Sequence, residues 1–284
     1  MRRTILVTGS SGRLGSSLVR SLAKDHAVVQ LDLVGPPSPE QAGLGRVFTG
    51  TFTDPALVAQ AMEGVDAVIH CGAIPGTRKP YEELIATNVL GTFVVLEEAG
   101  NRAEVEQFIY VSSIMMHGLC TRPYVDHLPD YLPVDEAHPS KAVDYYPCSK
   151  AQAEYWCRKY VQRFRKPIVV LRPPYIIRPD QESTFCAGPP HDVPHLYEYI
   201  GTSDLIDGIT RAMGYHPEDG FDRFLLHAAD QRSTMPSIEI AEKWFPGVPY
   251  DRDKLSACDG FGALVDWSHA ADRLGWAPRY RCRR

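Results

Sequence analysis

A chain of 284 residues with 44% hydrophobic residues can bury one large core, and its formal net charge of −5 disfavours nucleic acid and anionic membranes as partners. No apolar run approaches the roughly 20 residues of a membrane-spanning helix. Residues 1–3, Met-Arg-Arg, run directly into an apolar segment and leave no room for a secretory signal. The composition therefore predicts a cytoplasmic globular protein with neither nucleic acid nor a membrane as partner.

The seven cysteines stand at positions 71, 120, 148, 157, 186, 258 and 282. Their number is odd, they are scattered along the chain, and no Cys-x-x-Cys pair occurs. This pattern predicts free thiols rather than a disulfide framework or a zinc site. His191 and His195 enclose a proline, which argues against a helical pair of metal ligands, and no third ligand is evident. No metal is expected.

The first 172 residues alternate short β-branched runs with helical segments, which is the pattern of a parallel sheet with crossover helices. The expected strands are residues 4–8, 27–33, 46–49, 67–70, 107–112 and 167–172. The expected helices are residues 12–24, 55–62, 80–101 and 145–165. Residues 34–45, rich in proline and glycine, are expected to be irregular. Residues 113–144 are expected to be a long insertion, of a length that is usually functional or mobile.

From residue 173 the chain becomes rich in proline and histidine. A helix is expected at about residues 202–213, a strand at 221–226 and a helix at 237–245. The predicted fold class is α/β, a doubly wound parallel sheet with a small C-terminal lobe. Residues 1–172 would form the sheet domain, completed by later segments from about 201–230, and residues 173–284 would mainly form an interleaved substrate-binding lobe.

A glycine-rich turn follows the first predicted strand and opens the first helix, in the order Gly9-Ser10-Ser11-Gly12-Arg13-Leu14-Gly15. Glycines allow a tight turn, a close approach of the backbone to a pyrophosphate, and packing of the helix on the strand. The start of the helix offers N–H groups to phosphate. The residues predicted to bind a dinucleotide here are Gly9, Ser11, Gly12, Arg13, Leu14 and Gly15, which makes the sheet domain a Rossmann domain.

Asp32 ends the second predicted strand, 17 residues beyond Gly15. A carboxylate there accepts hydrogen bonds from both hydroxyls of an adenine ribose and repels a 2′-phosphate, so NAD is expected rather than NADP. The alternative reading of Asp32 is a residue that starts a turn. Further contacts with the cofactor are expected after the third and fourth strands, from Thr51, Phe52, Cys71, Gly72 and Ala73.

Tyr146 and Lys150 are four residues apart on a predicted helix and therefore share one face. An ammonium beside a phenol favours the phenolate, and lowering a tyrosine pKa from about 10 to roughly 7 needs about 4 kcal/mol. Ser112 and Ser113 end the fifth predicted strand, at the edge where such sheets bind ligands. A serine hydroxyl there can hold a substrate oxygen, although serine at a strand end is also a common cap.

These motifs together resemble the extended short-chain dehydrogenase/reductases of the NAD-dependent epimerase/dehydratase family over nearly the whole chain. The matching segments are Gly9 to Gly15, His70-Cys71-Gly72-Ala73, Asn88-Val89-Leu90-Gly91-Thr92, Ser112-Ser113-Ile114-Met115-Met116-His117-Gly118, Tyr146 with Lys150, and Asp266-Trp267-Ser268 with Leu274-Gly275-Trp276-Ala277-Pro278. The resemblance implies that Tyr146 is the general acid and base, that Lys150 binds the nicotinamide ribose and lowers the tyrosine pKa, and that Ser113 orients the reacting oxygen.

The same resemblance places Asn88 beside the active site. Further residues expected to contact the cofactor are Asn88, Tyr146, Lys150 and Pro173. Relatives often dimerise through the helix that carries the catalytic tyrosine, so a homodimer is expected. Trp156, Tyr155 and Tyr160 lie on that helix at spacings that suit helix packing or a subunit interface. His117 stands in place of the family's tyrosine before glycine, and either faces substrate or packs with a hydrogen bond.

Departures from the family narrow the reaction. Relatives that eliminate water resemble one another in having an acidic pair after the catalytic serine or threonine, where this chain has Ile114 and Met115, so a 4,6-dehydratase is not expected. That apolar pair indicates either a less hydrophilic substrate edge or a packed loop. The family's arginine is missing from residues 197–205, and Arg178 replaces a usual glycine, which puts recognition of a nucleotide diphosphate in doubt.

Three functional hypotheses remain. The first is an NAD-dependent epimerase or dehydrogenase acting on a secondary alcohol of a sugar or nucleotide sugar. The second is a small-molecule dehydrogenase of the uronate or polyol type, which the chain length and the similarity of residues 73–83 to uronate dehydrogenases favour. The third is an NAD-binding sensor without turnover, which the intact Ser113, Tyr146 and Lys150 disfavour.

Overall fold

The computed structural model describes residues 2–76, 80–119, 128–187 and 199–282, and the chain packs as two compact units. Unit 1 consists of Met1–Ser112, Asp144–Leu171 and Ala212–Asp222, and unit 2 consists of Ser113–Val143, Arg172–Arg211 and Arg223–Arg284. The chain therefore passes between the units at each of these boundaries. The helices described here do not combine the length and the apolar character that crossing a bilayer would require.

A seven-stranded sheet has the order β3-β2-β1-β4-β5-β6-β9. Its strands are β1 (Thr4–Thr8), β2 (Ala27–Asp32), β3 (Gly45–Thr49), β4 (Ala67–His70), β5 (Gln107–Val111), β6 (Ile168–Arg172) and β9 (Phe221–Leu225). The ladders from β3 to β6 are all parallel. The order of the strands reverses between β1 and β4, which is the point where doubly wound sheets bind ligands at their carboxyl ends. The predicted fold class is confirmed, and the predicted strands agree with these bounds to within one residue.

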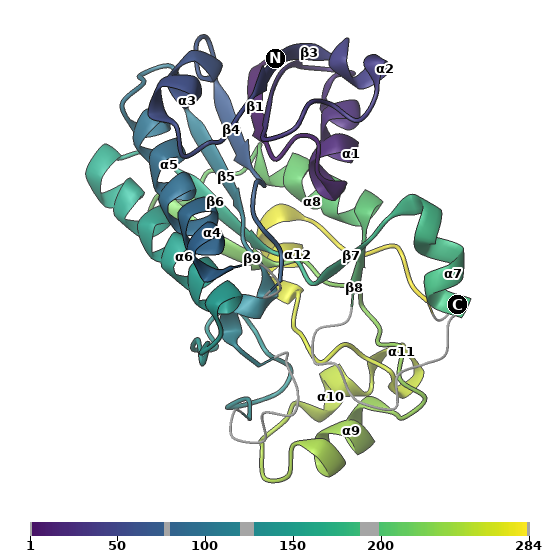
Figure 1. The fold of residues 1–284 in the computed structure, drawn as a ribbon. Helices are drawn as coiled ribbons and strands as arrows, with labels where there is room; N and C mark the ends of the chain where they lie inside the picture. Colours follow the sequence, from purple (N-terminus) through teal and green to yellow (C-terminus); the bar gives the residue numbers. More distant parts are fainter. Residues whose placement is uncertain (1, 77–79, 120–127, 188–198, 283–284) are drawn as a thin grey trace. The chain divides into compact units, whose positions relative to one another are not determined.

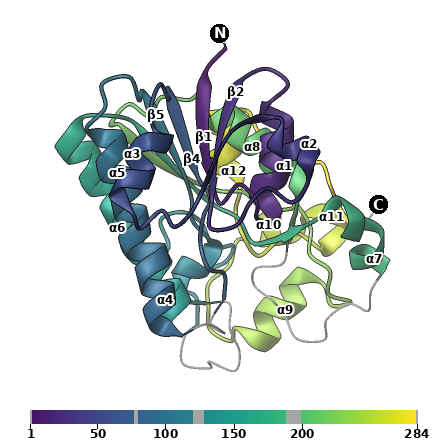
Figure 2. The ribbon, with the colours of Figure 1, turned by 45° about the horizontal axis from the view of Figure 1, so that its top comes forward.

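Helices of unit 1 cover both faces of its sheet (Figures 1 and 2). Helix α1 (Arg13–Leu22) lies on one face and buries Leu14, Leu18 and Leu22 at helical spacing. Helices α3 (Pro55–Ala61), α5 (Thr92–Gly100) and α6 (Tyr145–Phe164) lie on the other face and enclose the main core of the unit. The sheet is thus buried between two helical layers, which explains its runs of consecutive apolar residues.

Two segments of unit 1 differ from the sequence-based prediction. The single helix expected at residues 80–101 is instead α4 (Tyr81–Ile85), a π-helical segment (Ala86–Gly91) and α5. The irregular stretch expected at residues 34–45 contains a short helix, α2 (Pro39–Ala42). Ser38 caps α2 by accepting a hydrogen bond from the Gln41 N–H, and Pro39 pre-sets its first turn. The proline that suggested irregularity is therefore a helix start.

Unit 2 contains a parallel pair of short strands, β7 (Tyr175–Ile177) and β8 (Tyr199–Gly201). Its helices are α7 (Glu182–Ala187), α8 (Thr202–Ala212), α9 (Ser237–Trp244), α10 (Arg252–Leu255), α11 (Ala257–Gly260) and α12 (Ser268–Leu274). Asp204 on α8 ties down the C-terminal segment, because its carboxylate accepts hydrogen bonds from the N–H groups of Arg279 and Tyr280, both at 2.8 Å. The indole of Trp276 donates to the Asp204 carbonyl at 3.0 Å.

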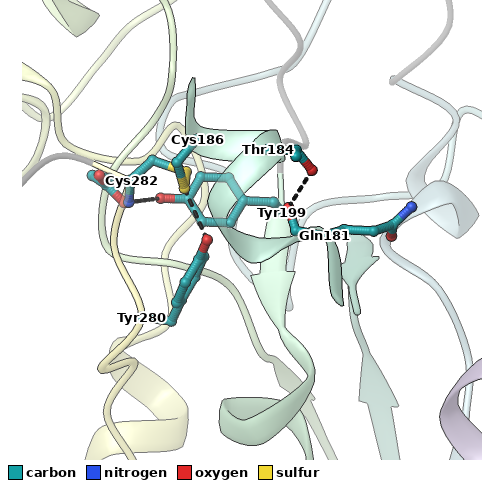
Figure 3. Close-up of a disulfide and its surroundings, with 7 residues drawn as sticks. Gln181, Thr184, Cys186, Tyr199, Tyr280 and Cys282 are labelled. Carbon is teal, nitrogen blue, oxygen red and sulfur yellow. Dashed lines mark hydrogen bonds between the residues drawn. A yellow bond between two sulfur atoms is a disulfide. The ribbon is translucent and has the colours of Figure 1, made fainter. Parts of the chain in front are cut away.

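Cys186 of α7 and Cys282 of the C-terminal segment form a disulfide (Figure 3). The prediction of free thiols is wrong for this pair. The two residues are 96 apart in sequence, and docking of the C-terminal segment brings them together, which no spacing rule indicates. Tyr199 accepts a hydrogen bond from the Cys282 N–H at 2.9 Å, so the bridge sits on a buried aromatic ring. The other described cysteines, Cys71, Cys148, Cys157 and Cys258, remain thiols.

Removing this disulfide is expected to destabilise unit 2. Because the bridge closes a loop of about a hundred residues, Cys282→Ser should lower the free energy of unfolding by about 2–4 kcal/mol. Urea denaturation under non-reducing conditions measures the change, and dithiothreitol should cause a similar loss in the wild type. Cys258→Ser, at a thiol outside the bridge, is the control. Equal urea midpoints for the wild type and Cys282→Ser would contradict the prediction.

Candidate active site

The glycine-rich turn of unit 1 is packed so tightly that its glycines are required. Gly9 has a φ of +67°, and a Cβ added to it would lie 2.6 Å from the Cα of Gly72. A Cβ on Gly15 would lie 2.0 Å from the carbonyl oxygen of Gly9. Gly12 occupies the N-cap position of α1, where no side chain caps the helix. The first turn of α1 therefore presents backbone N–H groups beside an open glycine cradle, which fits a dinucleotide pyrophosphate.

The other predicted members of this turn have different environments. Leu14 is buried in α1, so its side chain serves the core, whereas Arg13 is exposed. Ser11 has its hydroxyl hydrogen-bonded to the carbonyl oxygens of Val34 and Gly35, each at 3.0 Å. The turn is thereby tied to the segment that follows β2.

Asp32 lies at the end of β2 and is held against the glycine-rich turn. One carboxylate oxygen accepts a hydrogen bond from the Ser11 N–H at 2.9 Å, and the other accepts from the Val34 N–H at 3.2 Å. The two readings of Asp32 from the sequence are therefore compatible, because the carboxylate both shapes the turn after β2 and stands beside the predicted cofactor cradle.

The residues predicted after β3 and β4 have different environments. The Phe52 ring is buried, and a Cβ on Gly72 or Gly91 would lie within 2.6 Å of it. Thr51 is exposed, with its hydroxyl 2.8 Å from that of Thr53. Burial raises the pKa of Cys71 to about 12, and its thiol donates to the Thr8 carbonyl.

A chain of buried hydrogen bonds runs from the β4 loop to the π-helical segment. The Gly72 N–H donates to the Thr8 hydroxyl at 3.3 Å, which lies 2.6 Å from Nδ1 of His70. Nε2 of His70 lies 2.9 Å from the Thr92 hydroxyl, which donates to the Asn88 carbonyl at 2.7 Å. Since a hydroxyl has one hydrogen, Thr92 accepts from His70, and His70 is neutral with its proton on Nε2. Burial, aided by a nearby lysine charge, lowers its pKa to about 3.

Asn88 connects this series of hydrogen bonds to the start of α6. The side-chain NH₂ group of Asn88 donates to the Ile74 carbonyl and to the Ser149 hydroxyl, both at 3.1 Å. The side-chain oxygen of Asn88 accepts from the Ile74 N–H at 2.8 Å. Ser149 in turn donates to the carbonyl of Tyr146 at 2.7 Å. The π-helical segment, which the sequence-based prediction missed, presents Asn88 at this junction, and such segments are frequent at functional sites.

Tyr146 and Lys150 are one turn apart on α6, as predicted. The Lys150 side chain is 2% exposed; its ammonium donates to the Val111 carbonyl at 3.1 Å and to the Tyr110 hydroxyl at 3.4 Å. Burial lowers the pKa of Lys150 to about 8. Relative to its ordinary value of 10.5, this corresponds to about 3 kcal/mol against the charged form. Tyr146 is half-buried.

Glu154, one further turn along α6, was not singled out in the sequence. It is 5% exposed, and its carboxylate accepts a hydrogen bond from the Ser112 hydroxyl at 2.6 Å. The signal was present, because Glu154 follows Lys150 at the same spacing of four at which Lys150 follows Tyr146. In the sequence it looked like one more polar residue of a helix.

Ser113 and Pro173 belong to unit 2, and the N–H of Ile114, the residue after Ser113, donates to the Pro173 carbonyl at 3.1 Å. The Ser113 hydroxyl accepts from the Met115 N–H at 3.2 Å and caps a short 3₁₀ helix (Ile114–His117). Ile114 is buried in a core cluster of unit 2, and Met115 packs against that cluster. Of the two readings of this apolar pair, this packing supports the packed loop.

His117 has a packing role in unit 2. It is fully buried, Nδ1 lies 3.1 Å from the carbonyl oxygen of His138, and Nε2 accepts from the Arg172 guanidinium at 3.3 Å. Burial lowers its pKa to about 2, so the ring stays neutral. The pair His191 and His195 lies outside the described residues.

Comparisons with known proteins agree with this arrangement. The model of the NAD dependent epimerase/dehydratase family matches residues 5–210. An uncharacterized protein of Sinorhizobium fredii is 29% identical over 313 residues, 98% of this chain and 75% of that protein. The uronate dehydrogenase of Pseudomonas putida is 31% identical over 172 residues, 59% of each chain, so the match spans less than two thirds of that enzyme. The crystal structure of UDP-glucose 4-epimerase with UDP-glucose from Thermotoga maritima has a similar fold, with a TM-score of 0.74 and 18% identity over 97% of this chain and 94% of that one.

Replacing Asp32 by asparagine tests its assignment as the selector of the cofactor. Asparagine keeps an oxygen that can accept from Ser11 or Val34 but removes the negative charge that would repel a 2′-phosphate. Asp32→Asn should shift the ratio of NAD to NADP affinity by about tenfold or more towards NADP, a change of about 1.4 kcal/mol. Calorimetric titration with each cofactor measures the ratio. An unchanged ratio would assign Asp32 to the turn alone.

Proposed function

The chain belongs to the NAD dependent epimerase/dehydratase family and is an NAD-dependent enzyme, and from this premise we propose that it oxidises a secondary alcohol of a sugar or sugar derivative. The observation that carries the proposal is the pair on α6, a half-buried Tyr146 one turn from the buried ammonium of Lys150. NAD, when bound, supplies the acceptor for the hydride that leaves the alcohol carbon.

The residues of unit 1 would hold the cofactor in three places. The cradle of Gly9, Gly12 and Gly15 would receive the pyrophosphate, since side chains at Gly9 and Gly15 would collide with backbone atoms. Asp32 would bind the hydroxyls of the adenine ribose, and Lys150 those of the nicotinamide ribose. The rigid backbone of the turn and the uncapped start of α1 support this assignment.

Tyr146 would take the proton of the substrate alcohol on its phenolate oxygen and return it when the reaction runs in reverse. The positive charge of Lys150 would stabilise the phenolate, because the surroundings of the ammonium are buried and screen it poorly. The hydroxyl of Ser113, directly after Ser112 in the chain, would hold the reacting oxygen. A dehydratase reaction is disfavoured, since the residues after Ser113 are packed in an apolar core.

Two outcomes of the oxidation are possible, and each has its own support. Release of the oxidised product and NADH would make the protein a sugar or uronate dehydrogenase, which the 31% identity to a uronate dehydrogenase supports. Return of the hydride to the opposite face would make it an epimerase, which the likeness in fold to a UDP-glucose 4-epimerase supports more weakly at 18% identity.

Turnover assays test the reaction class directly. The purified protein is incubated with excess NAD and a panel of free sugars, uronates and nucleotide sugars, and NADH absorbance and product stereochemistry are followed. Stoichiometric NADH indicates a dehydrogenase, and an isomerised product without net NADH indicates an epimerase. Binding of NAD without conversion of any substrate would favour the sensor hypothesis.

Tyr146→Phe tests the proposed acid and base. Loss of proton transfer should lower kcat/KM by about 100-fold to 10,000-fold while NAD still binds. Tyr145→Phe changes an exposed tyrosine on the same helix and serves as the matched control, with activity close to that of the wild type. Full activity of Tyr146→Phe would exclude the mechanism.

The same helix carries an exposed aromatic face where a second copy of the chain would dock. Phe93 of α5 and Trp156 of α6 pack edge to face at 5.0 Å, and Tyr155 and Leu90 beside them are exposed. Tyr160, in contrast, is buried in the core of unit 1. An apolar face of this kind, on two neighbouring helices, suits a two-fold contact between identical subunits.

A charge placed in this face should prevent the association. Trp156→Glu is expected to give a monomer at concentrations where the wild type is a dimer, because a carboxylate would have to be taken out of water into an apolar contact. Light scattering coupled to size-exclusion chromatography measures the mass. Tyr175→Glu, at an exposed aromatic of unit 2, is the control. A wild type that is monomeric at all concentrations would refute the dimer.

A further inference from the structure

The ammonium of Lys150 is enclosed by groups from three elements of unit 1. From β5 it contacts the Val111 carbonyl and the Tyr110 ring, whose centroid lies 5.0 Å from Nζ. Burial raises the pKa of Tyr110 well above its ordinary value, so this hydroxyl stays neutral. From β4, the charge of Lys150 acts on His70, which is neutral and hydrogen-bonded at both ring nitrogens. Neither strand therefore supplies an ionised partner from these side chains.

Two thiols also interact electrostatically with the ammonium, and both are uncharged at neutral pH. Burial raises the pKa of Cys71, after β4, to about 12, and raises that of Cys157, on α6, well above its ordinary value. Glu154 is the remaining group that raises the pKa of Lys150 against the effect of burial. Among these neighbours, the negative charge that favours the ammonium is thus that of Glu154.

Glu154 is held in place from the sheet. The Ser112 hydroxyl, directly after β5, donates to its carboxylate at 2.6 Å, and both side chains are buried. Ser112 is itself fixed, because its N–H donates to the Leu171 carbonyl of β6 at 2.8 Å. Ser112 also precedes Ser113, the proposed holder of the substrate oxygen. The bond from Ser112 to Glu154 therefore adds to the bond from Lys150 to the Val111 carbonyl in linking the end of β5 to the helix that carries Tyr146 and Lys150.

We propose that Glu154 is a positioning residue of the reaction: its carboxylate, anchored by Ser112, keeps the Lys150 ammonium charged and fixed on α6, where it binds the nicotinamide ribose and stabilises the Tyr146 phenolate. The inference rests on the proposed function of Lys150 and extends it to a residue that does not touch substrate. A merely structural Glu154 would hold the helix to the sheet without affecting the protonation of Lys150.

Three variants separate charge from packing. Glu154→Gln removes the charge and keeps an oxygen that accepts from Ser112. Glu154→Asp keeps the charge on a shorter side chain. Ser112→Ala removes the anchor and leaves the carboxylate. Each is compared with the wild type and with Lys150→Met by measuring the dissociation constant of NAD calorimetrically between about pH 6 and pH 10, the range that spans the titration of a buried lysine.

Wild-type affinity should fall as pH rises through about 8, because Lys150 then loses its proton. Lys150→Met should not show this fall in NAD affinity with pH. Glu154→Gln should move the midpoint of this decrease in NAD affinity about one pH unit lower, since an interaction that favours the ammonium is gone. At pH 8 it should weaken the binding of NAD about fivefold. Glu154→Asp should restore a midpoint near that of the wild type, and Ser112→Ala should give an intermediate value.

A Glu154→Gln midpoint equal to that of the wild type would overturn the inference, as would equal shifts in Glu154→Gln and Glu154→Asp. If Glu154→Gln does not fold, Ser112→Ala decides, and an unshifted midpoint there overturns it. Because the measurement needs no substrate, a failure to find turnover leaves it unaffected. A wild type whose pH dependence matches that of Lys150→Met would instead overturn the proposed function of Lys150, and the inference with it.

Discussion

The buried ammonium of Lys150 is the constraint around which the site in unit 1 is organised. Burial works against its charge, and the polar neighbours contributed by the sheet are a carbonyl, a phenol and an imidazole that are all neutral. A cation in such surroundings acts strongly on any charge that develops nearby, because little water screens it. Placed one turn from Tyr146, it is more useful to a phenolate than the same lysine would be at the surface.

That arrangement requires a rigid support, and buried hydrogen bonds provide it. They connect the loop after β4 through Thr8, His70 and Thr92 to Asn88, and Asn88 continues through Ser149 to the backbone of Tyr146. The glycine-rich turn packs on the same loop through Gly9 and Gly72. Parts that come from distant stretches of sequence are therefore held in one network, in which the neutral tautomer of His70 is determined by its two threonine partners.

The sequence predicted those features that follow from local pattern. Strands buried on both faces appear as β-branched runs, and the glycines at 9, 12 and 15 indicate a tight turn, in which side chains at Gly9 and Gly15 would collide with the backbone. Features that depend on packing between distant residues were missed. The π-helical segment looks like ordinary helix in the sequence. Cys186 meets Cys282 where the C-terminal segment, held by Asp204, docks on unit 2. Glu154 was missed because its partner, Ser112, lies 42 residues earlier in the chain.

The apolar packing that follows Ser113 in unit 2 also disfavours the elimination of water. Elimination of water needs an acid and a base of its own beside the oxidised carbon. The positions that would follow Ser113 with such groups hold Ile114 and Met115, and their apolar packing could accept a carboxylate only at the cost of burying an uncompensated charge. Proton transfer in the proposed reaction is thus left to Tyr146, which serves oxidation in one direction and reduction in the other. A dehydrogenase and an epimerase built on this site would share every step up to the ketone, and would differ in whether that ketone leaves before the hydride returns.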